Sequence, residues 1–159
     1  MRTLVTYYSY SGNTEKVVNI FKEVLEKRGE LEIQRIRPKK EITSFLGQCV
    51  AARSGKRCEI EDLPLDVSGY DTVIIGSPVW AFAPAPAVSA YLDKVTGLSN
   101  KKTVILLTSG SGAGVKACFK RIHDLLSSKG ASGVSEVNIP NARMKEQGFI
   151  VASLEKALL

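Results

Sequence analysis

Histidine and cysteine are scarce in this sequence, and their scarcity limits the metal and disulfide chemistry that it can carry. Its 159 residues contain one histidine, His123, and three cysteines, Cys49, Cys58 and Cys118, with no C-x-x-C spacing. A single histidine argues against a zinc site, and an odd number of cysteines argues against a disulfide framework. We therefore expect no bound metal and three free, mostly buried thiols. A redox disulfide between Cys49 and Cys58 is the alternative.

Long apolar runs and a secretion signal are also missing. No apolar stretch approaches the roughly 20 residues with which a helix crosses a bilayer. The first residues lead straight into a strand pattern, without a secretory apolar region. We expect a cytoplasmic protein that does not bind membranes. The length, with 44% hydrophobic and 24% charged residues, is typical of one globular domain, which we expect to span 1–159.

Motifs of hydrolases and of P-loop proteins are absent as well. No serine lies in a G-x-S-x-G pattern, so a hydrolase triad has no support. His123 shares a helical stripe with Lys116 and Lys120, which indicates a solvated side chain. We expect no catalytic side chain.

Positive charge is in excess, and the excess is local. The net charge is +6; seven basic residues and one acid lie between 35 and 57, and five acids without a base follow between 59 and 71. A surface with a basic and an acidic side would steer a charged partner, although a plain solvated surface explains the pattern equally well. No nucleic-acid partner is expected, because aromatic residues do not interleave with the basic ones.

Strand and helix patterns alternate regularly along the chain. Such alternation predicts an α/β fold, here a three-layer, doubly wound sheet of five parallel strands in the order 2-1-3-4-5. The expected strands are 3–8, 31–37, 71–76, 103–108 and 134–139; the expected helices are 15–27, 42–53, 87–95, 115–126 and 145–158, with a long loop over 54–70.

Three loops of unusual composition follow the first, third and fourth strands, over 9–14, 77–86 and 109–114. These strands are neighbours in the expected order, and ligands of such sheets lie at the carboxyl ends of the strands. We therefore predict that the three loops converge on one ligand site.

The first loop has the composition of a phosphate cradle. It places hydroxyl and amide side chains where a helix begins, and a helix N-terminus attracts anions through unpaired N–H groups and its dipole. Gly12 permits a tight bend and a close approach of the backbone to a ligand. No Lys or Arg lies in the loop, so the cradle would suit a phosphate monoester held by neutral donors. Ordinary helix capping is the alternative.

The other two loops suit a flat ring. The second carries an exposed-looking aromatic pair, Trp80 and Phe82, between prolines, and an aromatic there can stack on a ring; a hydrophobic plug is the alternative. The third has three glycines, so its backbone can approach a ligand edge. It is neither a P-loop nor a G-x-G-x-x-G motif, since residue 115 is Val.

Taken in order, these loops resemble the flavodoxin-like family along nearly the whole chain. The motifs are Ser-Tyr-Ser-Gly-Asn-Thr after the first strand, Gly76-Ser-Pro-Val-Trp-Ala81 after the third and Thr108-Ser-Gly-Ser-Gly112 after the fourth. No long insertion splits the last strand, so the chain is similar to short-chain members. The resemblance implies FMN as cofactor. It implies a phosphate site at Ser9, Tyr10, Ser11, Gly12, Asn13 and Thr14, an isoalloxazine ring flanked by Pro78, Val79, Trp80, Ala81 and Phe82, and a contact with the other ring edge by Ser109, Gly110, Ser111 and Gly112.

Two departures from the family bear on function. Typical flavodoxins are acidic, whereas this chain is basic, and many have a Tyr in the third loop, where this chain has no aromatic residue. One ring face would then be open to a nicotinamide or a quinone. The leading hypothesis is a flavodoxin-type carrier of electrons between partner oxidoreductases. The alternative is an FMN-dependent NAD(P)H:quinone or related small-acceptor reductase, and a third hypothesis is a module that has lost its cofactor.

Overall fold

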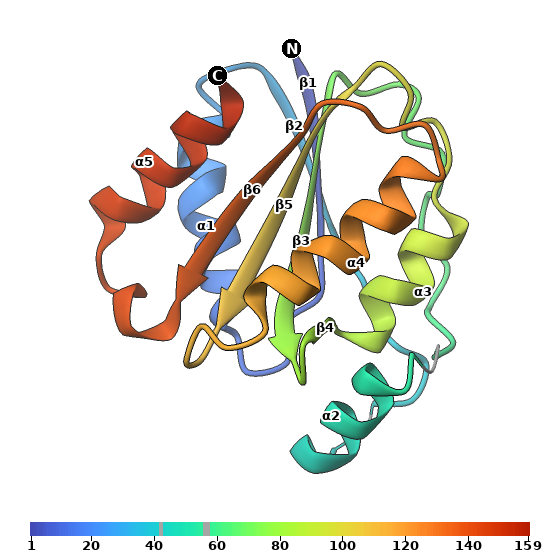
Figure 1. Ribbon diagram of the computed structural model, residues 1–159. Helices are drawn as coiled ribbons and strands as arrows, with labels where there is room; N and C mark the ends of the chain where they lie inside the picture. The colour runs from blue at the N-terminus through green and yellow to red at the C-terminus, as the bar shows by residue number, and fades with distance from the viewer. Residues whose placement is uncertain (42, 56–57) are drawn as a thin grey trace.

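Strands and helices alternate along the chain as predicted (Figure 1). The computed structural model describes residues 1–41, 43–55 and 58–159. The strands are β1 (Arg2–Tyr7), β2 (Glu30–Arg35), β3 (Thr72–Trp80), β4 (Ala83–Pro84), β5 (Lys102–Ser109) and β6 (Val134–Pro140). The helices are α1 (Asn13–Leu25), α2 (Phe45–Arg53), α3 (Pro86–Lys94), α4 (Val115–Ser127) and α5 (Gln147–Leu158), with a 3-10 turn, η1, at Asn141–Arg143.

The five long strands form one parallel sheet in the order β2-β1-β3-β5-β6, which confirms the predicted order. At its centre Val5 pairs with Ile33 on one side and with Ile74 on the other, and Ile74 pairs with Val104. The side chains of β3 and β5 are buried on both faces, as expected for central strands of a covered parallel sheet.

Helices cover both faces of this sheet, so the predicted three layers are confirmed (Figure 1). Helices α1 and α5 pack on one face, where Val17 and Ile150 share a buried cluster with Ile74. Helices α3 and α4 pack on the other face, where Tyr91 belongs to a cluster with Ile75. Neighbouring residues of β3 therefore serve opposite layers, because side chains alternate across a strand.

The third strand is longer than predicted. β3 continues past Gly76, because Ser77 and Pro78 pair with Leu107 and Thr108 of β5. The pairing of β1 with β3 ends at Gly76, so the missing N–H of Pro78 costs no hydrogen bond on that side. The prediction of a loop over 77–86 was therefore wrong for residues 77–80. The chain then turns into β4, which pairs antiparallel with β3 and was not predicted.

Helix α2 lies beyond the carboxyl end of the sheet, beside β4 and α3 (Figure 1). It begins later than predicted, with the Ser44 hydroxyl accepting the Gly47 N–H at 3.3 Å. Ile42, the first residue of the predicted helix, lies outside the described residues. The side chains of Leu46 and Val50 are 74% and 62% exposed, so this helix leaves apolar surface uncovered.

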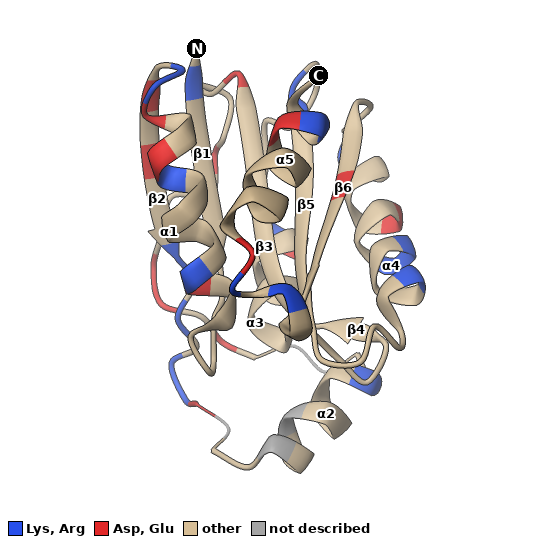
Figure 2. Cartoon of the chain, turned by 90° about the vertical axis from the view of Figure 1, so that its left-hand side faces the viewer, with Lys and Arg blue, Asp and Glu red and all other residues tan. Residues whose placement is uncertain are grey.

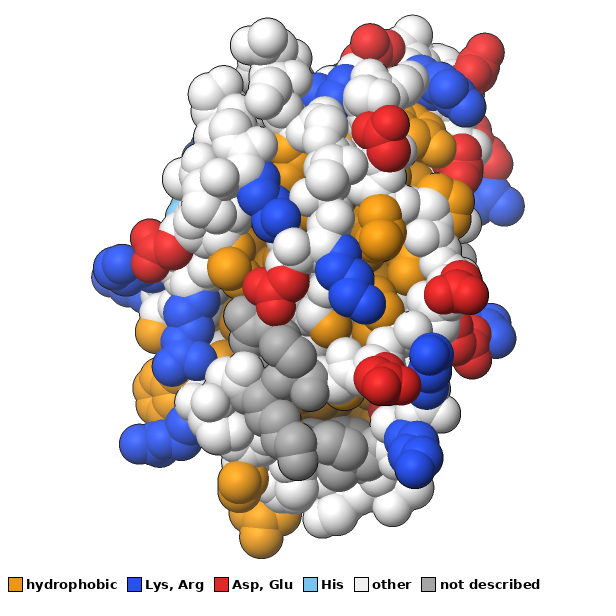
Figure 3. All heavy atoms as spheres, turned by 90° about the vertical axis from the view of Figure 1, so that its right-hand side faces the viewer, with side chains coloured by type: hydrophobic (Ala, Val, Ile, Leu, Met, Phe, Trp, Pro, Cys, Tyr) orange, Lys and Arg blue, Asp and Glu red, His pale blue; other side chains and the backbone are white. Residues whose placement is uncertain are grey.

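The basic and acidic stretches of the sequence lie side by side in space. Lys39 Nζ is 3.5 Å from a carboxylate oxygen of Glu59, and the Arg37 carbonyl accepts the Glu61 N–H at 2.8 Å. Figure 2 shows basic residues in the segment between β2 and α2, near the carboxyl end of the sheet. On the α3 and α4 side, Lys and Arg are mixed with Asp and Glu (Figure 3). Among the described residues, basic Arg37 and Lys39 therefore lie next to acidic Glu59 and Glu61, rather than on an opposite side of the molecule.

The cysteines are unbonded in the structure. Cys49, Cys58 and Cys118 are free, and Cys118 is fully buried. Burial raises the pKa of the Cys49 and Cys58 thiols, which lowers the thiolate fraction that a redox reaction would need. In the described part of the chain no helix is long and apolar enough to cross a membrane, and no three His, Cys, Asp or Glu side chains gather into a possible metal site.

Candidate functional site

The three unusual loops meet around one cleft at the carboxyl end of the sheet. Its volume of about 470 Å³ lies in the usual range for ligand pockets. Of the predicted site residues, all except Gly12 and Gly112 line it, and none of the described lining residues is charged. The lining residues are Ser9, Tyr10, Ser11, Asn13, Thr14, Pro78, Val79, Trp80, Ala81, Phe82, Thr108, Ser109, Gly110, Ser111, Ala113 and Asn141.

The first loop leaves backbone donors free at the start of α1. The first helical hydrogen bond runs from Lys16 N to Gly12 O at 2.9 Å, and the Glu15 N–H donates to Ser9 Oγ at 3.3 Å. Among the described residues, no acceptor pairs with the N–H groups of Gly12, Asn13 or Thr14. Capping accounts for one donor only, so the remaining N–H groups and the helix dipole have the chemistry that would suit an anion.

Side-chain hydrogen bonds join this loop to the other side of the cleft. The hydroxyls of Thr14 and Thr108 lie 2.9 Å apart and are buried, and Asn13 Nδ2 donates to Asn141 Oδ1 at 3.2 Å. Thr108, Ala113 and Asn141 were missed from the sequence. Asn141 carried a usable signal, because it follows β6, whose carboxyl end reaches the same edge of the sheet.

Trp80 is not the exposed aromatic that the sequence suggested. It is only 6% exposed, because the Tyr8 and Tyr10 rings pack edge-on against it, with ring centroids 5.6 Å and 5.9 Å from its own. Phe82 is 50% exposed, as expected, and Tyr10 is 41% exposed. The expectation of an exposed pair was therefore wrong for Trp80, and Phe82 and Tyr10 are the aromatic side chains that face solvent at the cleft.

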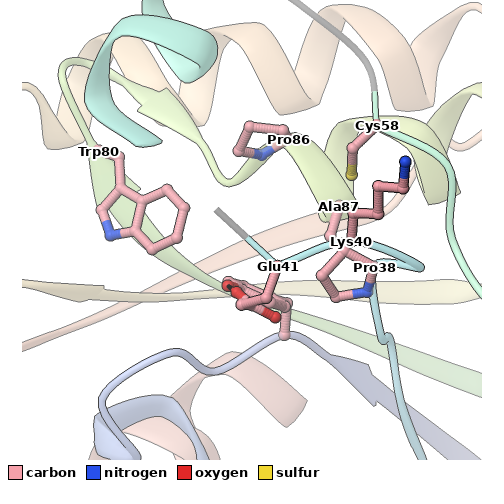
Figure 4. A pocket seen from close by; sticks show the side chains of 8 residues that line it. Pro38, Lys40, Glu41, Cys58, Trp80, Pro86 and Ala87 are labelled. Carbon is pink, nitrogen blue, oxygen red and sulfur yellow. Dashed lines mark hydrogen bonds between the residues drawn. The ribbon is translucent and has the colours of Figure 1, made fainter. Parts of the chain in front are cut away.

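Trp80 also lines a second, much smaller cavity (Figure 4). Its volume of about 20 Å³ is enough for about one water molecule. There the Tyr8 hydroxyl donates to the Glu41 carboxylate, and burial followed by this hydrogen bond raises the pKa of Tyr8. Tyr10 donates in the same direction, to the Thr43 carbonyl at 2.8 Å. The two tyrosines thus contact Trp80 with their rings and bind Glu41 and Thr43 with their hydroxyls.

The turn between β3 and β4 has an unusual backbone. Ala81 and Phe82 have φ values of 46° and 70°, in the left-handed region that a two-residue hairpin turn requires and that glycine or asparagine normally fills. Ser77 supports the turn, because its hydroxyl accepts the Ala85 N–H at 3.0 Å. Strained residues of this kind occur often at binding sites.

The third loop offers open space next to its backbone. A Cβ atom added at Gly110 or Gly112 would meet nothing within 4 Å. The Ser109 hydroxyl is already engaged, since it donates to Asn138 Oδ1 at 3.0 Å. The backbone of this loop, rather than its first hydroxyl, is therefore what a ligand would meet.

Comparison with known proteins places the chain in a family. Residues 1–143 match the model of the NADPH-dependent FMN reductase family. The chain belongs to this family. Membership in an FMN-binding family with the flavodoxin-like fold confirms the predicted resemblance and the predicted cofactor, FMN. No curated protein sequence matches the chain.

Solved structures with the same fold include FMN proteins of several kinds. The flavoprotein of Lactobacillus acidophilus NCFM in complex with FMN is 20% identical, with a TM-score of 0.63 over 92% of this chain and 98% of that one. Oxidised flavodoxin 2 from Bacillus cereus is 18% identical, with a TM-score of 0.61 over 98% and 99%. An apo NADH:FMN oxidoreductase is 16% identical, with a TM-score of 0.66 over 99% and 86%. At these identities the likeness shows the fold alone.

The cleft fits FMN in chemistry as well as in size. The unpaired N–H groups at the start of α1 suit its phosphate, and the uncharged walls with exposed Tyr10 and Phe82 suit a flat, largely apolar ring. The open backbone at Gly110 and Gly112 leaves room for a ring edge. The assignment of individual residues to phosphate and ring stays a prediction.

Proposed function

We propose that this protein is an FMN-dependent NAD(P)H oxidoreductase that passes electrons to a small acceptor such as a quinone. The observation that supports it most directly is the match of residues 1–143 to the NADPH-dependent FMN reductase family. It favours the reductase over the flavodoxin-type carrier, which was the leading hypothesis from the sequence alone.

Bound FMN would supply the redox chemistry, taking electrons from a reduced nicotinamide and passing them to the acceptor. In this proposal the loop over 9–14 binds the phosphate with neutral N–H and hydroxyl donors. Residues 78–82 lie along the ring, and 109–112 approach its other edge with backbone groups. The chain's own contribution is binding and orientation, and no side chain is assigned a covalent step.

Access to the ring is the second support for a small-molecule partner. The third loop has no aromatic side chain that would cover a face of the ring. A planar nicotinamide or quinone could therefore approach the cofactor from that side without displacing a protein ring. A cytoplasmic location is part of the same proposal, since reduced nicotinamides are the donors.

The test is steady-state oxidation of NADPH and NADH by the purified protein loaded with FMN, with a quinone and an azo dye as acceptors. We expect turnover of roughly 1 s⁻¹ or more, within the normal range for enzymes. If reduced nicotinamide is consumed no faster than by free FMN in buffer, the reductase proposal fails. Reduction only by another redox protein would restore the carrier hypothesis.

A further inference from the structure

The loop over 9–14, which is proposed to bind the phosphate, is hydrogen-bonded to a residue that does not line the cleft. Arg35, the last residue of β2, donates from Nη2 to the Ser9 carbonyl and from Nη1 to Glu15 Oε1, both at 3.0 Å. The Tyr7 hydroxyl donates to the same Glu15 oxygen at 3.3 Å. One guanidinium thus bridges the end of β1, the first turn of α1 and the end of β2.

These contacts fix both ends of the loop. Ser9 is its first residue and Glu15 follows its last, and the two residues are also joined directly through Ser9 Oγ and the Glu15 N–H. The N–H groups of Gly12, Asn13 and Thr14, for which the described part of the chain supplies no acceptor, lie between the two fixed points. Donors that are already fixed bind an anion without the cost of ordering the loop.

The same contacts decide the charge near the phosphate. Glu15 lies in the first turn of α1, where a free carboxylate would compete with a phosphate for the positive end of the helix. Arg35 pairs with that carboxylate, at side-chain exposures of 35% and 38%. The cradle can therefore lack basic residues and still avoid repelling a dianion.

We propose that Arg35 is a positioning residue for FMN, and that its forked guanidinium fixes the Ser9 carbonyl and the Glu15 carboxylate so that the loop is ready for the phosphate. The inference rests on the FMN binding that the proposed function requires. Geometry is central to it, because only an arginine can hold two acceptors in one plane, whereas a lysine acts as a point charge.

The test compares the affinities for FMN and for riboflavin, which lacks the phosphate, in Arg35→Met, Arg35→Lys and Arg37→Met. Arg37 lies two residues further on, so its variant loses the same charge without touching Ser9. We expect Arg35→Met to weaken FMN binding by roughly ten- to a hundredfold, the range of a charge-assisted hydrogen bond. Riboflavin binding should change less than about twofold, and Arg37→Met should leave both affinities nearly unchanged. Arg35→Lys should recover only a small part of the loss.

Two results would overturn the proposal. Equal losses of affinity for FMN and riboflavin would show that Arg35 only stabilises the protein in general. Full recovery of FMN affinity in Arg35→Lys would show that a positive charge at this position is sufficient. The double variant Arg35→Met/Glu15→Gln separates these effects further. It removes the repulsion between the Glu15 carboxylate and the phosphate, but it does not restore the hydrogen bonds that Arg35 makes to the loop. If that double variant binds FMN as the unmodified protein does, positioning is excluded.

Amide hydrogen exchange in the protein without FMN gives an independent readout. Exchange at Glu15 and Lys16, whose N–H groups donate to Ser9 Oγ and to the Gly12 carbonyl, should be faster in Arg35→Met than in Arg37→Met. Unchanged exchange at these two amides would contradict the proposed role. If the unmodified protein binds no FMN, the proposed function fails whatever the exchange shows. Arg35 would then order the loop without a role in cofactor binding, and the positioning role would be overturned.

Discussion

Helices α1 and α4 begin in the same way, yet only one of them presents an open N-terminus to the cleft. Each starts after an N-cap glycine, Gly12 with φ, ψ of 85°, −3° and Gly114 with 80°, −3°. Neither N-cap residue therefore has a side chain that could accept a hydrogen bond from the first turn. A Cβ atom added at Gly12 would meet nothing within 4 Å. At Gly114 it would lie 2.8 Å from Cδ1 and 2.9 Å from Cα of Phe82.

The difference lies in what covers each helix end. The β3–β4 turn places Phe82 against Gly114, whereas Asn13 and Thr14 at the start of α1 line the cleft. The two helix ends have the same backbone and the same direction of dipole, so backbone geometry alone does not select the anion site. Cover by the hairpin does distinguish the two helix ends, and it supports the proposal that the phosphate binds at α1 and the ring lies on the α4 side.

Alanine at the two glycines should separate crowding from backbone strain. Both substitutions place a Cβ at positive φ, which costs about 1–2 kcal/mol, and Gly114→Ala also forces Phe82 to move, which adds about 1–3 kcal/mol. We expect Gly114→Ala to lose about 2–5 kcal/mol of unfolding free energy and Gly12→Ala about 1–2 kcal/mol, by urea denaturation without FMN. Equal losses would mean that Phe82 does not cover the α4 end tightly.

Removing the Thr14 hydroxyl from α1 should weaken binding of the phosphate group and leave binding of the ring almost unchanged. We expect Thr14→Val to weaken FMN binding by roughly tenfold or more and riboflavin binding much less, because one donor to a charged oxygen is lost. Thr108→Val is the matched control, since it breaks the same 2.9 Å hydrogen bond but keeps the Thr14 hydroxyl. Lys116, at the equivalent place in α4, should tolerate Lys116→Met without an FMN-selective loss. A larger FMN-selective loss of affinity in Lys116→Met than in Thr14→Val would indicate that the phosphate binds at the start of α4 instead of α1.

Much of the fold could be predicted because its signals are local. The apolar runs of β3 and β5 and the regular alternation with amphipathic helices are enough to give a covered parallel sheet, and the strand order then brings three loops together. The end of β3 could not be predicted, since Ala81 and Phe82 carry none of the glycine or asparagine that normally marks a hairpin turn.

The details of the cleft depend on contacts between distant residues. Trp80 is buried by Tyr8 and Tyr10, which lie some seventy positions earlier in the sequence, about as far as the β1–β3 pairing requires. The loop over 9–14 appeared to lack a cation, and Arg35 reaches its carbonyl only because β2 pairs beside β1. Composition reveals which residues a loop contains but not which neighbour holds it.

The α4 side of the cleft should be sensitive to the bulk of the third loop. Gly110 has open space around it and no positive φ, so Gly110→Ala should leave stability unchanged. We expect it to weaken FMN and riboflavin binding alike, by roughly three- to tenfold, because the new methyl group would crowd the ring edge rather than the phosphate. Gly133→Ala, at an equally open position at the other end of the sheet, is the control. A loss of affinity for FMN but not for riboflavin would indicate that the phosphate lies near α4.

The smallest effect is expected at the turn that covers α4. Ala81→Gly removes the steric cost of a left-handed alanine, about 1–2 kcal/mol, from the folded state. It also increases the conformational entropy of the unfolded chain, which lowers the unfolding free energy by about 0.4–1 kcal/mol. The net gain in unfolding free energy should therefore be about 0.5–1 kcal/mol, visible as a small rise in the urea midpoint at unchanged slope. FMN affinity should stay the same if Phe82 keeps its place against Gly114. A fall in both stability and affinity would show that the side chain of Ala81, rather than the backbone of the turn, determines how α4 is covered.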